Sequence, residues 1–383
     1  MSDRRWIWGV LSLAFVVFLR MLGIFLVIPV FSLGTLTEYA GSTKFLAGVA
    51  LGGYAVTQAI SQFPMGWISD RWGRKIALVI GLLIFGIGGL WAYLTTTIEG
   101  LIIARLVQGL GGVSAVVMAA MGDISPPQYR ARSYMLSGMA IGSSIFLGII
   151  LGGILYDIIG FRKLFLILAI LSFIGVLIAL MLPLPKKPVS QSTNTNLKLS
   201  EIFSLISPAL YVVFALTLLM QVYFFVLPLA LTELNIDRAK ATALIIIPSA
   251  FVYPIIHIAE KRGKIKMTYY LGYLLVMFAS LLYTLGYDNI LPIVAILGGT
   301  TVYLMGYSLF QPLLPSFISF RVGEGRRGIA MAMYNFVGYG GMAVGGPLAG
   351  LIMQHVPSAI WIVPLGVSLI MFVFVRALAN AHH

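Results

Sequence analysis

The sequence predicts an all-α polytopic membrane protein whose twelve transmembrane helices form two pseudo-symmetric six-helix bundles. Hydrophobic residues make up 60% of its 383 residues and charged residues only 10%, whereas charged residues approach about 25% in soluble domains. The apolar residues gather in long stretches, each close to the roughly 20 residues that a helix needs to cross a bilayer. A charged segment between the second and third stretches recurs in degenerate form about 190 residues later, which indicates a duplicated half.

Each predicted span is a helix rather than a strand of an outer-membrane barrel. The apolar stretches are too long for such strands and lack their alternating pattern, and a helix satisfies its own backbone polar groups in lipid. The 41 glycines and 17 prolines suit helices that pack closely or bend within a membrane. In chain order, the spans cover residues 7–33, 44–66, 77–97, 100–121, 133–156, 162–183, 206–231, 240–260, 268–287, 290–318, 327–353 and 357–378.

The basic residues predict the orientation of these spans. The formal net charge is +13, and most lysines and arginines fall in loops that share one side of the membrane if the N-terminus is inside. Arg4 and Arg5 precede an apolar run that continues to Phe31 without a cleavage site, so we interpret this run as an uncleaved first span. The charge therefore reports topology and not a nucleic-acid partner. We expect a multi-pass protein of the cell (inner) membrane with both termini in the cytoplasm.

Several chemistries find no support in the sequence. It contains no cysteine, which excludes disulfides and thiolate metal sites. It contains no P-loop and no H-E-x-x-H motif, and the glycine runs at 86–89 and 109–112 lie within apolar stretches rather than between a strand and a helix. We therefore expect no enzyme activity, no cofactor and no metal, and we assign no function to His382 and His383.

A polar segment divides the chain into two halves. Residues 184–205 hold too little apolar surface to build a core, so they are interpreted as a cytoplasmic linker between an N-terminal bundle, 1–183, and a C-terminal bundle, 206–383. Gly152-Gly153 in the fifth span aligns with Gly345-Gly346 in the eleventh. Parallel repeats of this kind are typical of secondary transporters, which bind substrate near the membrane midplane between the repeats.

Three motifs stand at corresponding points of known transporters. Gly66 to Lys75 matches G-x-x-x-D-R-x-G-R-K at every defined position, and Arg105 to Gly111 matches R-x-x-Q-G-x-G. The glycine motif G-x-x-x-G-P-x-x-G-G is incomplete in the fifth span, where Gly148 to Asp157 lacks the proline, while a Gly-Pro-x-x-Gly sequence stands at 346–350. On these motifs the whole chain resembles the major facilitator superfamily, in particular its twelve-span drug:proton antiporter branch. The resemblance implies the major facilitator fold and alternating access.

The resemblance also implies a conformational latch at the first motif. In the family, Asp70 lies near the N-terminus of the eleventh span, where free amides and the helix dipole favour a carboxylate. Arg74 could then pair with Asp123, and the charges would hold the halves together on the cytoplasmic side. The alternative is that the cations only anchor the topology. The latch cluster comprises Gly66, which would allow close packing, Asp70, Arg71, Gly73, which would form the turn, Arg74 and Asp123; its second-half counterpart comprises Glu260, Lys261, Gly263 and Lys264.

Two arginines fall inside predicted spans, Arg20 in the first and Arg105 in the fourth. A charge inside a bilayer costs about 2.5–3.5 kcal/mol on insertion scales, so both are candidates for substrate binding or coupling. For Arg105 the alternative is a structural role, bonding backbone carbonyls with help from Gln108. For Arg20 the alternative is snorkelling or a bond to a neighbouring helix. All 12 carboxylates lie in or beside loops, so the arginines would favour an anionic or zwitterionic substrate.

The proton carrier is open among three residues. Asp123 and Asp157 flank the fourth and fifth spans and would titrate if buried. His257, in the eighth span, can change charge near neutral pH, but a lone histidine on an apolar helix is more often a packing residue. Polar residues that would line a cavity, or else face another helix or lipid, are Gln221, Gln311, Tyr334 and Asn335.

Small residues predict close helix approach in the fifth and eleventh spans. Gly138-x-x-x-Gly142 and Gly148-x-x-x-Gly152 are expected to line one face of the fifth span. Gly346 and Pro347 are the corresponding residues of the eleventh. In the family, this seam seals or bends the outer gate.

These observations favour a secondary transporter that exports small amphiphilic compounds in exchange for protons, acting as a monomer in the lipid bilayer. The first alternative is a facilitator or symporter for a small organic anion, favoured by the two membrane arginines. The second is a membrane sensor or scaffold that transports nothing, for which an eroded latch loop or an added soluble domain would be expected. Neither sign is present in the sequence.

Overall fold

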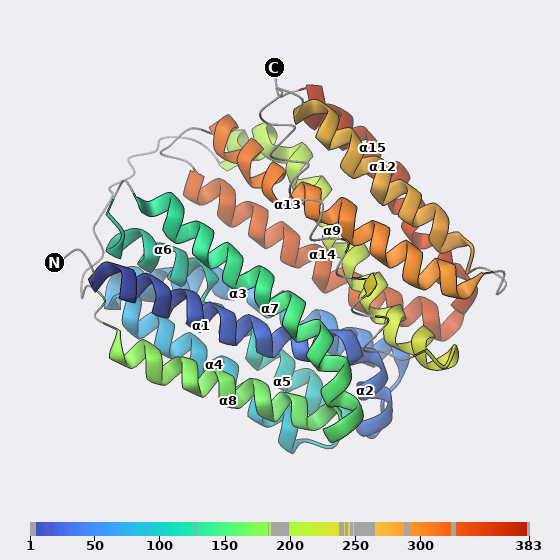
Figure 1. The fold of residues 1–383 in the computed structure, drawn as a ribbon, viewed down its shortest axis with the longest axis horizontal. Coiled ribbons are helices and arrows are strands. Elements are labelled where there is room, and N and C mark those ends of the chain that lie inside the picture. Colours follow the sequence, from blue (N-terminus) through green and yellow to red (C-terminus); the bar gives the residue numbers. More distant parts are fainter. Residues whose placement is uncertain are drawn as a thin grey trace. The chain divides into compact units, whose positions relative to one another are not determined.

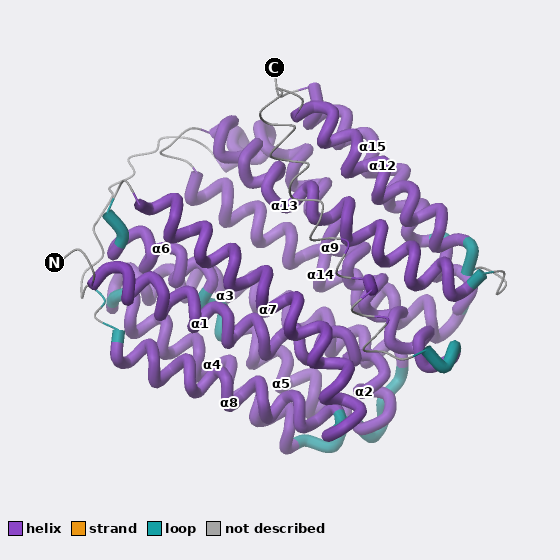
Figure 2. Tube along the Cα trace, in the orientation of Figure 1, coloured by secondary structure: helices purple, strands orange, loops and turns teal. Residues whose placement is uncertain are grey.

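The computed structural model describes residues 5–126, 129–182, 184, 199–236, 241, 244–245, 248, 265–286, 291–322 and 327–380. Within these ranges the chain is helical, with one isolated bridge between Ala40 and Thr97, and Figure 2 shows no strand. The predicted helical membrane fold is confirmed. Several predictions concern residues outside the described ranges: most of the span 240–260, most of the linker 184–205, and the candidates His257, Glu260, Lys261, Gly263 and Lys264.

Nine helices or helix runs in the described part are long and apolar enough to cross a membrane. They do not include the helices over the predicted spans 44–66 and 290–318, and the first of these carries Thr57, Gln58, Ser61 and Gln62 at its centre. The exact number of twelve therefore stays a prediction. The nine are Trp6–Glu38, Arg74–Leu94, Ile98–Ile124, Arg132–Ile159, Phe161–Met181, Ser200–Glu233, Ile265–Thr284, Ile329–His355 and Pro357–Asn380.

The chain separates into two compact units, Met1–Gln191 and Ser192–His383. In unit 1, α1 packs against α7 and α8, while α4 packs against α5 and α8, and α3 against α5 (Figure 1). Buried side chains such as Leu13, Leu78 and Val117 join α1, α4 and α6 in one core. The helices are α1 (Arg5–Val27), η1 (Ile28–Val30), α2 (Phe31–Glu38), α3 (Lys44–Trp72), α4 (Arg74–Leu94), α5 (Ile98–Leu110), α6 (Ser114–Ile124), α7 (Arg130–Ile159) and α8 (Phe161–Met181).

The predicted fourth span, 100–121, is not one continuous helix. It divides into α5 and α6 around Gly111 and Gly112. A Cβ atom at Gly111 would lie 2.7 Å from the backbone nitrogen of Phe85 in α4, so only glycine permits this approach of the two backbones. The break places a backbone carbonyl, that of Gly111, inside unit 1, where a side chain can reach it.

Unit 2 repeats the packing order of unit 1. Its helices are α9 (Leu199–Glu233), α12 (Ile265–Thr284), the π-helical η4 (Val294–Gly299), α13 (Thr300–Val322), α14 (Arg327–His355), η6 (Pro357–Trp361) and α15 (Val363–Asn380). α9 packs against α14 and α15, and α12 packs against α13 and α15 (Figure 1). The packing of α9 against α14 and α15 corresponds to that of α1 against α7 and α8. The packing of α12 against α13 and α15 corresponds to that of α4 against α5 and α8. The boundaries 1–183, 184–205 and 206–383 stay a prediction.

One glycine pair makes the same helix crossing in both units. Gly148 and Gly152 of α7 lie against α1, and Gly341 and Gly345 of α14 lie against α9. A Cβ atom at any of the four would lie within 3.2 Å of a backbone carbonyl oxygen, that of Leu22, Leu26, Phe214 or Leu218, respectively. Backbone contact of this kind is the packing that small-x-x-x-small pairs allow in membrane helices.

The single glycine face predicted for the fifth span is wrong. A Cβ atom at Gly138 or Gly142 would meet no described atom within 4 Å, unlike Gly148 and Gly152. Gly148 and Gly152 follow Gly138 and Gly142 by ten residues, and over ten residues a helix turns about 80° less than three full turns. The two pairs therefore point in different directions. The close packing predicted for Gly66 is likewise not found among the described residues. In α14, Gly346 is buried and Pro347 lies within the helix, next to Gly345, which approaches α9.

Candidate functional site

The charged turn between α3 and α4 depends on Gly73. Its backbone has φ 100° and ψ 157°, a conformation that residues with a side chain rarely adopt. α3 ends at Trp72 and α4 begins at Arg74, so the chain reverses direction at the single residue between them. This reversal places Arg74 beside the last turn of α3.

Arg74 forms the centre of an ion-pair cluster within unit 1. Its Nε donates to Asp123 Oδ2 at 2.8 Å, and its Nη1 donates to Asp70 Oδ1 at 2.6 Å and to Ser69 Oγ at 2.8 Å. The side chains of Arg74 and Asp123 are only 11% and 15% exposed, whereas that of Asp70 is 69% exposed. Water screens an exposed pair, so the Arg74–Asp123 bond contributes more than the Arg74–Asp70 bond. The cluster ties the α3–α4 turn to α6.

The other members of the latch cluster are peripheral to these bonds. Arg71 is exposed, and its guanidinium carbon lies 5.2 Å from the ring centre of Trp67. The ion pair described above shows that the predicted pairing of Arg74 with Asp123 is present. A role of the cluster in holding the two halves together stays a prediction.

Arg20 lies buried in unit 1, 2% exposed, and bonds to neighbouring segments. Its Nη2 donates to Gln58 Oε1 at 2.9 Å, to Tyr54 Oη at 3.2 Å and, more weakly, to Gly111 O at 3.4 Å. Its guanidinium carbon lies 4.9 Å from the ring centre of Phe85. The bond to a neighbouring helix, one of the two alternatives stated for Arg20, is therefore present.

Arg105 is also 2% exposed and also has neutral partners. Its Nη1 donates to Gln108 Oε1 at 2.6 Å, and its Nε donates to Ala50 O at 3.4 Å. Its guanidinium carbon lies 4.6 Å from the ring centre of Tyr54 and 5.2 Å from that of Phe31, within the range of cation–π attraction. The bonds to Ala50 O and to Gln108 match the structural role that was the alternative to substrate binding for Arg105.

Tyr54 joins the two arginines into one polar centre. Arg20 bonds its hydroxyl and Arg105 lies over its ring, and no carboxylate among the described residues forms an ion pair with either arginine. The two buried cations therefore have neutral partners and share one of them, Tyr54, and burying them without a compensating negative group is costly. Tyr54 was missed in the sequence, although its spacing of four residues from Gln58 places both on one face of a helix.

The remaining described candidates lie near the end of α7 in unit 1 and in the helices of unit 2. Asp157, near the end of α7, is exposed and so does not meet the condition of burial stated for a proton carrier. In unit 2, Gln311 and Asn335 are exposed and Tyr334 is buried. Gln221 is buried, and its Nε2 lies 3.5 Å from Met342 O, at the limit of a hydrogen bond.

A second tie in unit 1 involves Glu38, a residue not predicted to be structural. Its carboxylate accepts bonds from the backbone nitrogens of Phe161, at 2.5 Å, and Arg162, at 3.0 Å, at the start of α8. The Arg162 side chain in turn donates to Tyr93 O at 2.8 Å. Burial raises the pKa of nearby Tyr39, whose hydroxyl donates to Ala92 O at 2.6 Å, so this tyrosine stays neutral.

Glu38→Ala is expected to destabilise unit 1 by about 1–2 kcal/mol, because it removes a carboxylate cap from two free amides of α8. The measurement is the thermal unfolding midpoint of the purified protein in detergent. Glu99→Ala is the matched control, since Glu99 is an exposed carboxylate in the first turn of α5. Equal midpoints for the two variants would contradict the role of the cap.

A polytopic helical chain with repeated packing and a charged turn after its second span is built as a membrane transporter. The chain belongs to the Major Facilitator Superfamily, whose family model matches residues 13–346. It is 32% identical over 366 residues to the inner membrane transport protein YajR of Escherichia coli (strain K12), covering 92% of this chain and 78% of that protein. It is 28% identical over 356 residues to Multidrug resistance protein 1 of Bacillus subtilis (strain 168), covering 87% and 86%.

The fold agrees with that of solved transporters. A POT family transporter in complex with a thioalcohol-conjugated peptide superposes with a TM-score of 0.78 over 97% of this chain and 96% of that chain, at 16% sequence identity. An identity this low supports the fold alone. The chain is thus a multi-pass membrane protein of a family that carries small molecules, and not an enzyme.

Proposed function

We propose that this protein is a secondary active transporter that works by alternating access and exports small amphiphilic compounds in exchange for protons. The observation that carries the proposal is the Arg74–Asp123–Asp70 cluster, a set of charges at a helix turn that is partly buried and able to stabilise one conformation. The similarity to Multidrug resistance protein 1 along 87% of the chain supports export of drug-like compounds. The similarity to an inner membrane transport protein supports placement in the cell membrane.

Of the described proton-carrier candidates, Asp123 suits the coupling role better than Asp157. Asp123 is 15% exposed and bonded to Arg74, so its protonation would weaken an ion pair that a conformational change could break. Asp157 is exposed, so it does not meet the condition of burial. We assign proton coupling to the breaking of the Arg74–Asp123 pair. The proposal also places both termini in the cytoplasm and takes the monomer as the working unit.

A second candidate function is a facilitator or symporter for a small organic anion. The observation that favours it is the buried centre of Arg20 and Arg105, which has no ion-paired carboxylate among the described residues. A desolvated cation attracts an anion and repels a lipophilic cation. The same centre would accept the negative end of a zwitterion.

The test uses purified protein in liposomes that contain a trapped pH-sensitive dye. Lipophilic cations, organic anions and zwitterions are added in turn, and proton flux is recorded together with substrate flux. We expect amphiphilic compounds to move protons across the membrane, and protein-free liposomes give the leak to be subtracted. Substrate flux of organic anions without proton flux would replace the first proposal by the second. Absence of flux across the panel would contradict both and favour a sensor.

A further inference from the structure

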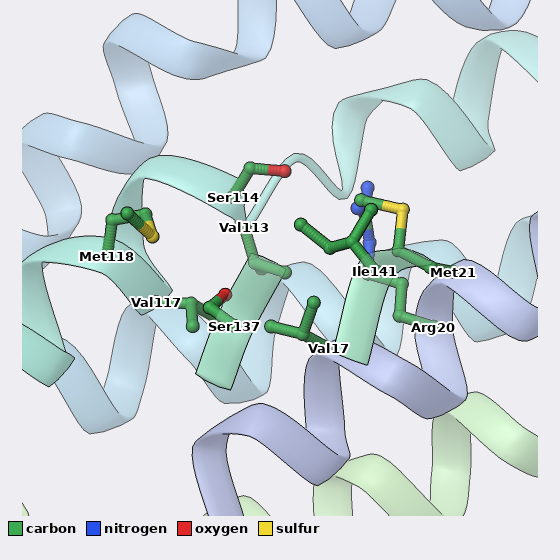
Figure 3. A pocket seen from close by; sticks show the side chains of 9 residues that line it. All are labelled: Val17, Arg20, Met21, Val113, Ser114, Val117, Met118, Ser137 and Ile141. Atoms are coloured by element: carbon green, nitrogen blue, oxygen red, sulfur yellow. The ribbon is translucent and has the colours of Figure 1, made fainter. Parts of the chain in front are cut away.

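A small cavity lies beside Arg20 in unit 1. Side chains of α1, α6 and α7, together with Val113 just before α6, surround it, and Figure 3 shows them converging from these segments. Its polar lining consists of Arg20, Ser114 and Ser137, and its other walls are apolar. About 50 Å³ is open to the centres of water-sized molecules.

Around this cavity, the polar atoms without a partner are all able to donate. Arg20 Nε, Ser114 Oγ and Gln58 Nε2 have no hydrogen-bond partner among the described residues. Arg20 and Ser114 line the cavity, and Gln58 bonds Arg20 through its other amide atom. Unsatisfied buried donors are costly, and a site that holds several of them beside an unpaired positive charge favours a negative ligand. A second buried cation, Arg105, lies over the ring of Tyr54, whose hydroxyl bonds Arg20, so its charge adds to the positive field at this site.

We propose that this cavity binds a small monovalent anion, a halide ion or a single carboxylate group, held by Arg20 Nε and Ser114 Oγ. The cavity volume limits the size of the ligand. It exceeds the roughly 10–15 Å³ that a water molecule needs. It is far smaller than the sites for drug-sized molecules, which have volumes of about 300–1,000 Å³. The apolar walls replace hydration poorly, so among halide ions the weakly hydrated bromide binds better than the strongly hydrated fluoride. The proposal does not depend on which compound the protein exports.

The experiment is a titration of the full chain in detergent, in a buffer whose only anion is gluconate, which is too large for the cavity. Bromide and formate are added separately at constant ionic strength, and the thermal unfolding midpoint is followed by tryptophan fluorescence. A ligand that binds only the folded state raises the midpoint in a saturable way. We expect both anions to saturate. We expect Arg20→Gln to weaken the apparent affinity about tenfold or more, and Ser114→Ala about threefold.

Two matched variants distinguish loss of anion binding from a general effect of removing a positive charge or a buried hydroxyl. Arg162→Gln removes the same charge at the start of α8, and Ser144→Ala removes a buried hydroxyl that bonds Ile141 O within α7. Both should respond like the unaltered protein. If Arg20→Gln does not fold, Ser114→Ala still decides, because Ser114 Oγ bonds no described atom and its loss costs the fold no hydrogen bond.

The outcomes also distinguish the source of the anion. Saturation by bromide that an exported compound does not displace would support a resident inorganic ion. Saturation only by formate and other carboxylates, displaced by a carboxylate-bearing substrate, would support the negative end of a substrate. A midpoint that rises equally in all variants, or never saturates, would be a general salt effect and would overturn the proposal.

Discussion

Gly152→Leu should leave little folded protein, whereas Gly142→Leu should be tolerated. A Cβ atom at Gly152 would overlap the carbonyl oxygen of Leu26 and lie 3.0 Å from Pro29 Cγ, so α7 would have to move away from α1. Overpacking typically costs about 1–3 kcal/mol, and the cost here lies at the upper end because backbone atoms cannot rotate aside as a side chain can. At Gly142, which is exposed, an added Cβ atom would meet no described atom within 4 Å. The two variants add the same side chain to the same helix.

Both variants are compared by the monodisperse fraction after detergent extraction and by thermal unfolding. We expect Gly152→Leu to lower the unfolding midpoint by at least about 5 °C and to reduce the monodisperse fraction. Gly345→Leu should behave like Gly152→Leu, because a Cβ atom there would lie 2.6 Å from Leu218 O. Similar midpoints for Gly152→Leu and Gly142→Leu would show that the α1–α7 crossing is not as close as described.

Asp123→Asn should reduce transport about tenfold or more while the protein still inserts and folds. The substitution keeps the shape of the side chain but removes its charge, leaving Arg74 with Asp70, which is largely exposed. A hydrogen bond to a charged group contributes about 1.5–3 kcal/mol, enough to shift an equilibrium between two conformations by tenfold. Asp70→Asn should also impair transport without preventing insertion, since it weakens the same cluster and leaves the apolar spans unchanged.

The measurement is the initial rate of substrate-driven proton flux in liposomes, normalised to the amount of inserted protein. Lys75→Gln is the control, because it removes a charge from the same turn but from a side chain that is outside the latch cluster and outside the ion pairs of Arg74. We expect it to retain most of the rate. Normal turnover of both Asp123→Asn and Asp70→Asn would remove the latch hypothesis and leave these residues as topology anchors.

Properties that follow from local sequence were predictable. The length and composition of the apolar stretches predict membrane helices, because lipid offers the backbone no hydrogen bonds. Gly73 could be assigned to a turn because its neighbours are charged and stand between two spans, and the ion pair of Arg74 with Asp123 followed from the family motif. The glycine spacing also predicted a close crossing at Gly148 and Gly152, and a Cβ atom at either glycine would meet the backbone of α1.

Only the tertiary structure decided which of these features meet. Gly138 and Gly142 have the same spacing as Gly148 and Gly152, but the rotation of α7 turns them away from α1. Arg20 bonds residues 34, 38 and 91 positions away in the chain, so its partners depend on how α1, α3 and the break after α5 pack. By itself the sequence determined a duplicated, helical membrane protein with two arginines in its spans. The cavity beside Arg20, and the sharing of Tyr54 with Arg105, arise because helix packing brings distant segments together at angles that local spacing does not encode.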